Sequence, residues 1–266
     1  MAVNSIPLLA LDRAQKEAFD RDGYLVVRGL YGAGEIAELR ERFHQLLRTP
    51  EAAHPGLRYS YEQPEVLAER PVDPNNPRGV WMIMDTPLAD DYCFDQIRDP
   101  RVVDIIGDLL GPDVNFFNGK ARIKPPGYRN TQGWHQDWPY ERHTLPELAA
   151  AITYLDDTGP GAAATRVIPG SHRQGEWPHD ERSAIPDAAA AGWPEVEVTA
   201  RAGDVAFIHV MVVHRAGDNH STQNRTAVIN EYKSRAARPL KYQPLAFNEL
   251  PLLRGGRPTT AAASRG

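Results

Sequence analysis

Apolar positions in the first 110 residues recur mainly with the spacing of helices. Residues 11–22 indicate a short amphipathic helix that is capped by Asp12 and ends near Gly23, and the apolar residues 24–27 that follow predict a strand. A second helix is predicted over residues 34–48 and a third over residues 102–110. The second helix carries an apolar stripe of the kind that packs on a sheet, formed by Ile36, Leu39, Phe43, Leu46 and Leu47.

Beyond Pro112 the pattern changes to short apolar runs separated by turns that contain glycine and proline. The strand candidates are residues 115–124, 150–155, 196–199, 205–213 and 225–233. Because no regular helix separates these runs, they predict an antiparallel sandwich or barrel and not a parallel α/β sheet.

Two segments lack any sustained period. Residues 49–77 are rich in Pro, Asn, Glu and His, which indicates an extended surface segment or a lid. Residues 250–266 show no apolar periodicity, so we expect a mobile tail there. The sequence therefore predicts a single domain over residues 1–249, with a helical N-terminal support over residues 12–110.

The composition limits which side chains can hold a metal and which partners the protein can have. The chain has 266 residues and a single cysteine, Cys93, which excludes an internal disulfide and a cysteine-based zinc cluster. Any metal must therefore be held by histidine and carboxylate. The 30 Lys and Arg residues against 35 Asp and Glu residues give a net charge of −5, which argues against a nucleic-acid-binding surface.

Neither a membrane span nor a secretory signal is visible in the sequence. The longest strongly apolar run, residues 205–213, is far shorter than the roughly 20 residues that a spanning helix needs. The first residues have no basic region and reach Asp12 before an apolar core develops. We therefore expect a soluble, cytoplasmic protein.

The segment GYRNTQGWHQDWPYERH, residues 127–143, contains the first candidate metal ligands. His135 and Asp137 are two positions apart, and in an extended strand such residues project to the same face, so an imidazole and a carboxylate can converge on one ion. The pair alone is weak, because a solvated loop histidine beside a turn aspartate has the same spacing.

Further histidines follow in residues 203–232. His214 ends the apolar run 205–213, where a barrel strand reaches its mouth, and His220 lies in the next turn. His209 is five positions before His214, and an odd separation along a regular strand puts the two side chains on opposite faces. Two histidines and one carboxylate form the facial triad of non-haem Fe(II) oxygenases, but a zinc hydrolase could use the same ligands.

Arg225 separates these two readings. It lies 11 residues after His214, at the start of the next apolar strand, where a hairpin return could bring it beside the metal. A buried arginine there needs an anionic partner, and a carboxylate matches the guanidinium best. A dicarboxylate cosubstrate would supply one. The alternative is a surface arginine at a strand end.

With these residues in place, the chain resembles the phytanoyl-CoA dioxygenase family of Fe(II)- and 2-oxoglutarate-dependent oxygenases. The first helix followed by DGYLVVRGL resembles the N-terminal block of the family, and KPPG shortly before WHQDWPY resembles its metal-binding block. ITYLDD followed by IPGSH resembles the middle strands. The last block is matched by GD, His214, Gly217, Asn219 and Arg225, and the resemblance covers residues 12–235.

The resemblance implies a mainly β fold with flanking helices, a double-stranded β-helix (a cupin-like jelly roll) whose core we expect over residues 78–235. It implies Fe(II), 2-oxoglutarate and O2 as metal and cosubstrates, and it makes His135, Asp137 and His214 the iron ligands. Arg225 would then bind the distal carboxylate of 2-oxoglutarate. Further residues that the resemblance places at the cosubstrate are Thr153, Asn118 and Lys120.

Such an enzyme would hydroxylate or oxidatively cyclise an unactivated C–H position of a small molecule. Asp137 disfavours halogenation, because related halogenases carry a small residue there. A bacterial secondary metabolite, such as a sugar, aminoglycoside or oligosaccharide antibiotic intermediate, is the substrate we expect. The family usually carries Glu-Asn-Gly before IPGSH, whereas this chain has GPGAAATRV, so substrate contacts of that loop do not carry over.

The substrate candidates are aromatic and acidic residues with two readings each. Trp134, Trp138 and Tyr140 flank the ligands and either line the pocket or pack the barrel mouth. Asp85, Asp90 and Asp91 form either a solvated acidic loop or a contact for a cationic or polyhydroxylated ligand. Two other functions stay open at this point, a zinc-dependent hydrolase and a non-catalytic jelly-roll binding protein.

Overall fold

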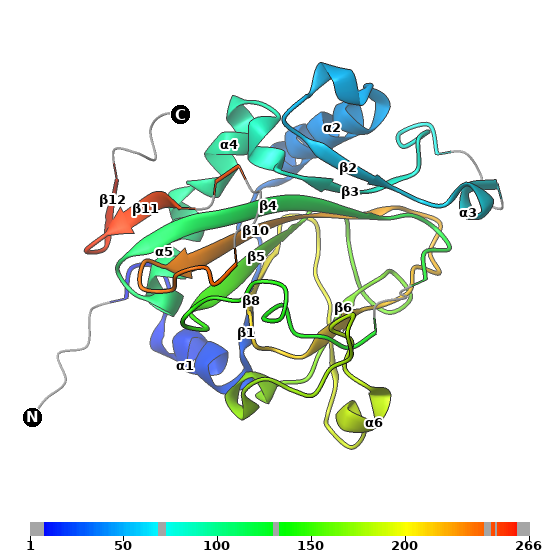
Figure 1. Cartoon of the computed structure of the whole chain (residues 1–266). Helices are drawn as coiled ribbons and strands as arrows, with labels where there is room; N and C mark the ends of the chain where they lie inside the picture. Colours follow the sequence, from blue (N-terminus) through cyan, green and yellow to red (C-terminus); the bar gives the residue numbers. More distant parts are fainter. Residues whose placement is uncertain (1–7, 69–72, 130–132, 242–245, 248, 260–266) are drawn as a thin grey trace, which may run out of the picture.

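The framework of the molecule is a curled antiparallel sheet of nine strands (Figure 1). The computed structural model describes residues 8–68, 73–129, 133–241, 246–247 and 249–259. The main path of the sheet, in spatial order, is β1 (Tyr24–Val27), β8 (Val205–His209), β5 (Leu148–Tyr154), β10 (Arg225–Ser234), β4 (Val114–Lys124), β11 (Leu250–Arg254) and β12 (Arg257–Pro258). The other two strands, β2 (Arg58–Tyr61) and β3 (Val80–Met84), join this path where β3 pairs with β4.

A second, smaller sheet faces the first. It consists of β7 (Val196–Val198), β6 (Thr165–Val167) and β9 (His214–Ala216), all antiparallel. Two facing antiparallel sheets, one of them curled, confirm the expected mainly β jelly-roll class.

Most helical residues precede β4 and cover the outer face of the large sheet (Figure 1). The longer helices are α1 (Arg13–Asp22), α2 (Ala33–Arg48), α4 (Asp91–Ile97) and α5 (Pro100–Leu110). The short ones are η1 (Glu51–Ala53), α3 (Pro64–Ala68), η2 (Thr86–Leu88), η3 (Ser171–Gln174) and α6 (Asp187–Ala190). The three helices predicted from periodicity correspond to α1, α2 and α5.

The ends of α1 follow from its capping residues. The Asp12 side chain accepts from the backbone N–H of Gln15, and the Gln15 side chain accepts from the N–H of Asp12. Gly23 ends the helix at φ +79°, where a Cβ would lie 2.3 Å from Val212. Only glycine fits this left-handed position, so the chain turns there into β1.

Alternation along the strands gives the large sheet two different faces. Ala149, Ala151 and Phe207 point outward into the core beneath the helices. Their neighbours Ala150, Ile152 and Ile208 point inward, toward the small sheet. The inner face is therefore the wall on which a pocket between the sheets can be built.

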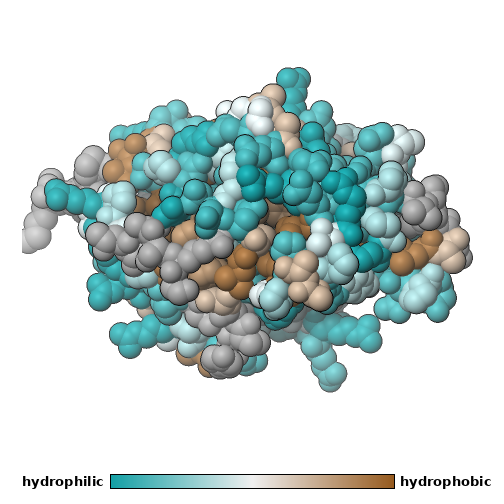
Figure 2. Space-filling view, turned by 90° about the horizontal axis from the view of Figure 1, so that it is seen from above, coloured by the Kyte–Doolittle hydropathy of each residue, from teal (hydrophilic) through white to brown (hydrophobic). Residues whose placement is uncertain are grey.

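The exposed sides of the helices are polar. Figure 2 shows the molecule from above, the side on which α2 and β2 lie in Figure 1, as mostly hydrophilic, with apolar side chains at the surface in limited patches. The amphipathic stripe of α2 agrees with this view, because Ile36, Leu39 and Phe43 are buried and the intervening residues face solvent. No helix among the described residues is both long and apolar enough to cross a bilayer.

Two boundaries differ from the sequence-based expectation. The strand predicted over residues 205–213 ends at His209, and residues 210–213 form a turn before β9 begins at His214. The segment 49–77 contains η1, β2 and α3, and β2 pairs with β3, which the apolar pattern had not revealed. Both strands are short and lie toward an edge, where alternation is weak.

The expected mobile tail is wrong for residues 250–258. Strand β11 pairs with the first part of β4, and Leu252 and Leu253 are 1% and 0% exposed in the outer core. A two-residue partner, β12, completes a hairpin. The periodicity was missed because only five residues form the strand, and residues 260–266 lie outside the described residues.

Shortening Leu253 tests whether this C-terminal strand is part of the core. We expect Leu253→Ala to lower the free energy of unfolding by about 2–5 kcal/mol, since it leaves a cavity beneath α5. Leu240→Ala, at a side chain that is 60% exposed, is the control and should change it by less than about 0.5 kcal/mol. Equal urea midpoints for the two variants would contradict the prediction.

Candidate metal centre and pocket

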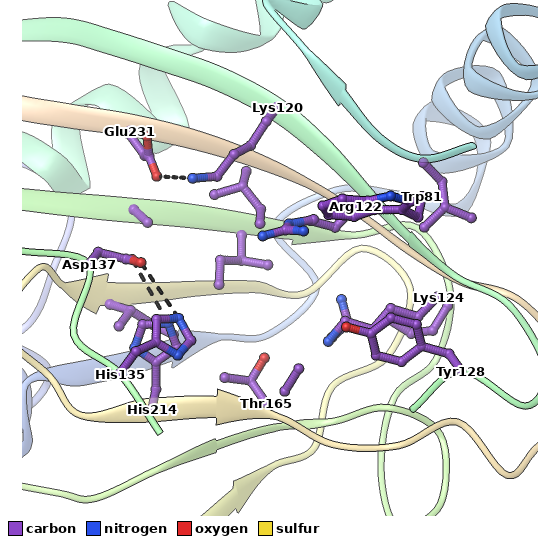
Figure 3. Close-up of a pocket in the computed structure, with 17 residues that line it drawn as sticks. Trp81, Lys120, Arg122, Lys124, Tyr128, His135, Asp137, Thr165, His214 and Glu231 are labelled. Carbon is purple, nitrogen blue, oxygen red and sulfur yellow. Dashed lines mark hydrogen bonds and ion pairs between the residues drawn. The ribbon is translucent and has the colours of Figure 1, made fainter. Parts of the chain in front are cut away.

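Three of the predicted residues, His135, Asp137 and His214, come together at one end of the space between the sheets (Figure 3). One ligand atom from each lies within 4.8 Å of the others. His135 and Asp137 come from the loop between β4 and β5, and His214 begins β9. The backbone fixes their relation, since the N–H of His135 donates to the carbonyl of His214 and the reverse bond is also made, both at 2.9 Å.

The orientation of both imidazole rings is set by backbone carbonyls. His135 Nδ1 lies 3.1 Å from the Gly133 oxygen, and His214 Nδ1 lies 3.0 Å from the Val212 oxygen. A carbonyl can only accept, so each Nδ1 carries a proton and each Nε2 is the nitrogen that can offer a lone pair to a metal. These Nε2 atoms lie 3.8 and 3.9 Å from the two Asp137 oxygens, which is too far for hydrogen bonds and leaves room for an ion.

The protonation states also suit a cation. Burial and the neighbouring His214 lower the pKa of His135 to about 3, so its ring is neutral at pH 7. Burial alone would raise the pKa of Asp137, but His214 and Lys120 lower it overall. A neutral imidazole such as that of His135 and an ionised carboxylate are the forms that bind a divalent metal.

Gln136, between the two ligands of the loop, faces away from them and is 1% exposed. Its amide nitrogen donates to the carbonyls of Met211 and Gly175, and its amide oxygen accepts from the N–H of Trp177. The loop that carries His135 and Asp137 is therefore anchored to the turn that precedes His214.

A pocket extends from this cluster between the two sheets (Figure 3). The ligands lie at one end, and Arg122, Lys124 and Tyr128 lie at the other. The walls come from both sheets and include Trp81, Lys120, Ile152, Thr165, Ile208, Arg225 and Glu231.

Arg225 is buried and lines the pocket, so the surface reading of this residue is wrong. Its Nε and Nη2 donate to the carbonyl of Ala163 at 3.1 and 2.6 Å, and its guanidinium lies over the ring of Tyr154. Within the described part of the chain no carboxylate forms an ion pair with it. Lys124 is its direct partner on β4, and burial together with Arg225 and Arg122 lowers the pKa of Lys124 well below its usual value.

Lys120 and Glu231 form an ion pair on the pocket wall, with 2.6 Å between Nζ and Oε1. Asn118 donates to the other carboxylate oxygen of Glu231 at 2.7 Å. Of the two β4 residues predicted to touch the cosubstrate, Lys120 therefore lines the pocket, whereas Asn118 holds Glu231 behind it.

The prediction for Thr153 is wrong. Thr153 pairs with Val205 and Val228, and both valines belong to the outer core beneath the helices. The pocket is lined by its neighbour Ile152 instead. Alternation on β5 decides the face, and counting from Ala150 on the inner side excludes Thr153.

The aromatic residues beside the ligands pack the surroundings of the site and do not line the pocket. Trp134 is buried under Arg215, whose guanidinium lies 4.4 Å from its ring centre, and Trp138 packs in a separate small core with Phe117. Tyr140 is exposed and meets the edge of His135, with its hydroxyl donating to the Arg182 carbonyl.

The acidic residues before β4 do not face the pocket either. Asp85 is buried in an ion pair with Arg58, and Asp90 caps α4 while it pairs with Arg42. Asp91 is exposed in the first turn of α4. A substrate contact for a cation at these residues finds no support in the structure.

His209 stays outside the cluster, as expected, although the argument from an unbroken strand does not hold. It packs against Phe19 and His172 on the far side of the sheet. The exposed His220 also lies outside the cluster.

Several pocket residues were missed by the sequence analysis, namely Trp81, Arg122, Lys124, Tyr128 and Thr165. A signal for two of them was present. Lys120, Arg122 and Lys124 alternate along β4, so once Lys120 faces the pocket the other two must do so as well.

Comparison with known proteins adds a family match. The family model "Phytanoyl-CoA dioxygenase (PhyH)" matches residues 19–227. A curated relative from Stutzerimonas stutzeri, named probable alpha-ketoglutarate-dependent hypophosphite dioxygenase, is 27% identical over 85% of this chain and 79% of its own length. Ectoine dioxygenase from Bordetella parapertussis is 25% identical over 85% of this chain and 76% of its own length.

A solved structure shares the fold. The epimerase SnoN, in complex with Fe3+, alpha ketoglutarate and nogalamycin RO, superposes with a TM-score of 0.68 at 21% identity. The match covers 89% of this chain and 93% of that one. At this level of identity the likeness concerns the fold.

The pair of Lys120 and Glu231 gives a prediction on pH. Burial alone would lower the pKa of Lys120, but Glu231 raises it overall, so the wild-type pair stabilises the fold at neutral pH and loses this contribution only as pH rises through the raised pKa. In Glu231→Gln burial dominates, and the unfolded chain then binds more protons than the folded one. We expect a loss of about 3 kcal/mol at pH 7 that shrinks toward pH 10.

Urea unfolding at both pH values measures this difference. The matched control is the double variant Lys120→Met with Glu231→Gln, which has no unpaired charge and should recover most of the loss. A deficit in Glu231→Gln that stays constant from pH 7 to pH 10 would show that Lys120 is not the cause.

Proposed function

Since the chain belongs to the phytanoyl-CoA dioxygenase family of Fe(II)- and 2-oxoglutarate-dependent oxygenases, we propose that His135, Asp137 and His214 hold the iron and that Arg225 holds 2-oxoglutarate beside it. The enzyme uses O2 to oxidise a small organic molecule. The family membership decides against the zinc-dependent hydrolase and the non-catalytic binding protein, which the sequence had left open.

The geometry of the triad carries this proposal. Two Nε2 lone pairs and one ionised carboxylate converge within 4.8 Å, and the donor set is the one that non-haem Fe(II) oxygenases use. Both Nδ1 protons are held by carbonyls, so the rings stay in the ligating orientation. The buried residues around the cluster thus fit an iron ion.

Arg225 supports the binding of a dicarboxylate. Its guanidinium is buried at the opposite end of the pocket from the triad, beside Lys124, and the carbonyl of Ala163 orients it. A carboxylate is the anion that a guanidinium matches best in such a setting. The distal carboxylate of 2-oxoglutarate would supply this anion, with its keto-acid end toward the triad.

The residues of the chain do the positioning. Iron and 2-oxoglutarate would supply the oxidising chemistry when bound: 2-oxoglutarate and O2 give succinate and CO2, and the remaining oxygen atom either turns a C–H bond of the substrate into C–OH or leaves as water with two substrate hydrogens as a ring bond forms. Ile152, Ile208 and Ile229 give the inner wall an apolar lining that limits water. Arg225 and the triad together would fix the cosubstrate at its two ends, which leaves the rest of the pocket to the substrate.

For the substrate we propose a small bacterial secondary metabolite that carries hydroxyl groups, such as a sugar or an oligosaccharide antibiotic intermediate. A solved neighbour, SnoN, is complexed with nogalamycin RO, and the pocket walls are rich in polar side chains. An aminoglycoside is a weaker candidate. The described pocket offers a cation no free acid, because Lys120 and Asn118 occupy Glu231 and Asp137 faces the metal site.

Iron analysis tests the triad. We expect the wild-type protein, reconstituted with Fe(II) without oxygen and desalted, to keep iron stoichiometrically, and His135→Ala and His214→Ala to lose most of it. His220→Ala changes an exposed histidine of the same region and should keep its iron. Unchanged iron in both triad variants would refute the ligand assignment.

The role of Arg225 is tested by 2-oxoglutarate turnover to succinate. We expect Arg225→Met to raise KM for 2-oxoglutarate by about 10–100-fold, because charge-assisted hydrogen bonds to a carboxylate are lost. Arg215→Met removes a guanidinium that packs on Trp134 outside the pocket and should leave KM within about twofold. The assignment fails if both variants have the wild-type KM.

A further inference from the structure

Arg122 is a pocket cation for which the proposed function has no use. Its guanidinium lies over the ring of Trp81, 4.8 Å from the ring centre, and extends into the pocket (Figure 3). Across the described ranges no acceptor forms a hydrogen bond or an ion pair with it. The other pocket cations differ, because Lys120 pairs with Glu231 and Arg225 donates to Ala163.

The sheet builds a place for this side chain. Arg122 follows Lys120 and precedes Lys124 on the inner face of β4, and the neighbouring strand β10 places Ala227 opposite it. On its other side β4 pairs with β3, the strand that carries Trp81. The indole nitrogen of Trp81 donates a hydrogen bond to the Tyr61 carbonyl, which fixes the ring on which the Arg122 guanidinium stacks.

The charges of the loaded pocket leave Arg122 uncompensated. Glu231 is committed to Lys120 and Asn118, and Asp137 to the metal. In the proposed function one carboxylate of 2-oxoglutarate would go to Arg225 and the other to the iron. Burial and the two arginines lower the pKa of Lys124, which makes it a weaker competitor for an anion. A guanidinium remains protonated and is costly to bury alone, so an anion beside it would be strongly favoured.

We propose that Arg122 binds an anionic group of the substrate, a carboxylate or a phosphorus oxyanion, with Trp81 holding the plane of the guanidinium. The inference rests on the proposed function and adds the substrate's charge to it. Arg225 then binds the cosubstrate and Arg122 binds the substrate. Two residues along β4, about 7 Å, separate Arg122 from the residue opposite Arg225, so two anions can be held at once.

Binding of small probes tests this without knowledge of the substrate. The protein with Fe(II) and 2-oxoglutarate bound, kept free of oxygen, is titrated calorimetrically with propionate, methylphosphonate and the neutral propionamide. We expect at least one anion to bind while propionamide does not, and the better of the two anions identifies the group. Arg122→Met should weaken this binding by about 10–100-fold and change the affinity for 2-oxoglutarate by less than about twofold.

The controls separate this inference from the proposed function. Arg215→Met should bind the probe as the wild type does. Thermal unfolding of ligand-free Arg122→Met should occur at the wild-type temperature or above it, because an uncompensated charge is removed, whereas a purely structural arginine would lower it. If the wild type binds neither Fe(II) nor 2-oxoglutarate, the proposed function itself has failed.

Three results would overturn the role of Arg122 while the proposed function stands. The first is binding of 2-oxoglutarate with no binding of either anion. The second is equal probe affinity in Arg122→Met and the wild type. The third is competition between the probe and 2-oxoglutarate, or a parallel loss of both affinities in Arg122→Met, which would assign the guanidinium to the cosubstrate.

Discussion

The reciprocal backbone hydrogen bonds between His135 and His214 are the constraint on which the site depends. They join a loop of the large sheet to the first residue of β9, and they bring together ligands that are 79 positions apart in the chain. Gln136 fixes the same loop to the turn before His214. Since both rings are oriented by carbonyls of their own segments, a shift of one residue in this pairing would turn a ligand out of the cluster.

The sequence points to the three residues of this cluster because its signals are local. His135 and Asp137 are two residues apart, and a histidine and an arginine at strand ends are visible without knowing the partners of those strands. The prediction for Thr153 is wrong because β5 is buried and apolar on both faces. In such a strand the alternation of apolar residues does not show which face a residue is on. The short strands β2, β3 and β11 carry too few residues for a period, and only their pairing partners define them.

The pocket is rich in positive charge although the protein as a whole is negative. A chain with a net charge of −5 gathers Lys120, Arg122, Lys124 and Arg225 on the inner walls of one pocket, while acids such as Asp85 and Asp90 pair with arginines outside it. Composition could not reveal this, because it averages over position. Alternation on β4 places three of these cations on one face, and the register with β10 adds the fourth. Charges inside the pocket are screened only weakly by water, so these cations attract anions strongly.

One edge of strand β4 pairs with two different strands, and this affects the order in which the sheet can be completed during synthesis. Its second half is covered by β3, but its first half is covered by β11, which follows the other strands that pair with β4 along the chain. Until residues 250–254 emerge, the N–H and C=O groups of Val114 and its neighbours lie open at the edge of a nearly finished sheet. This edge of β4 thus depends on a five-residue strand, and a chain without it would expose unpaired backbone groups to other chains.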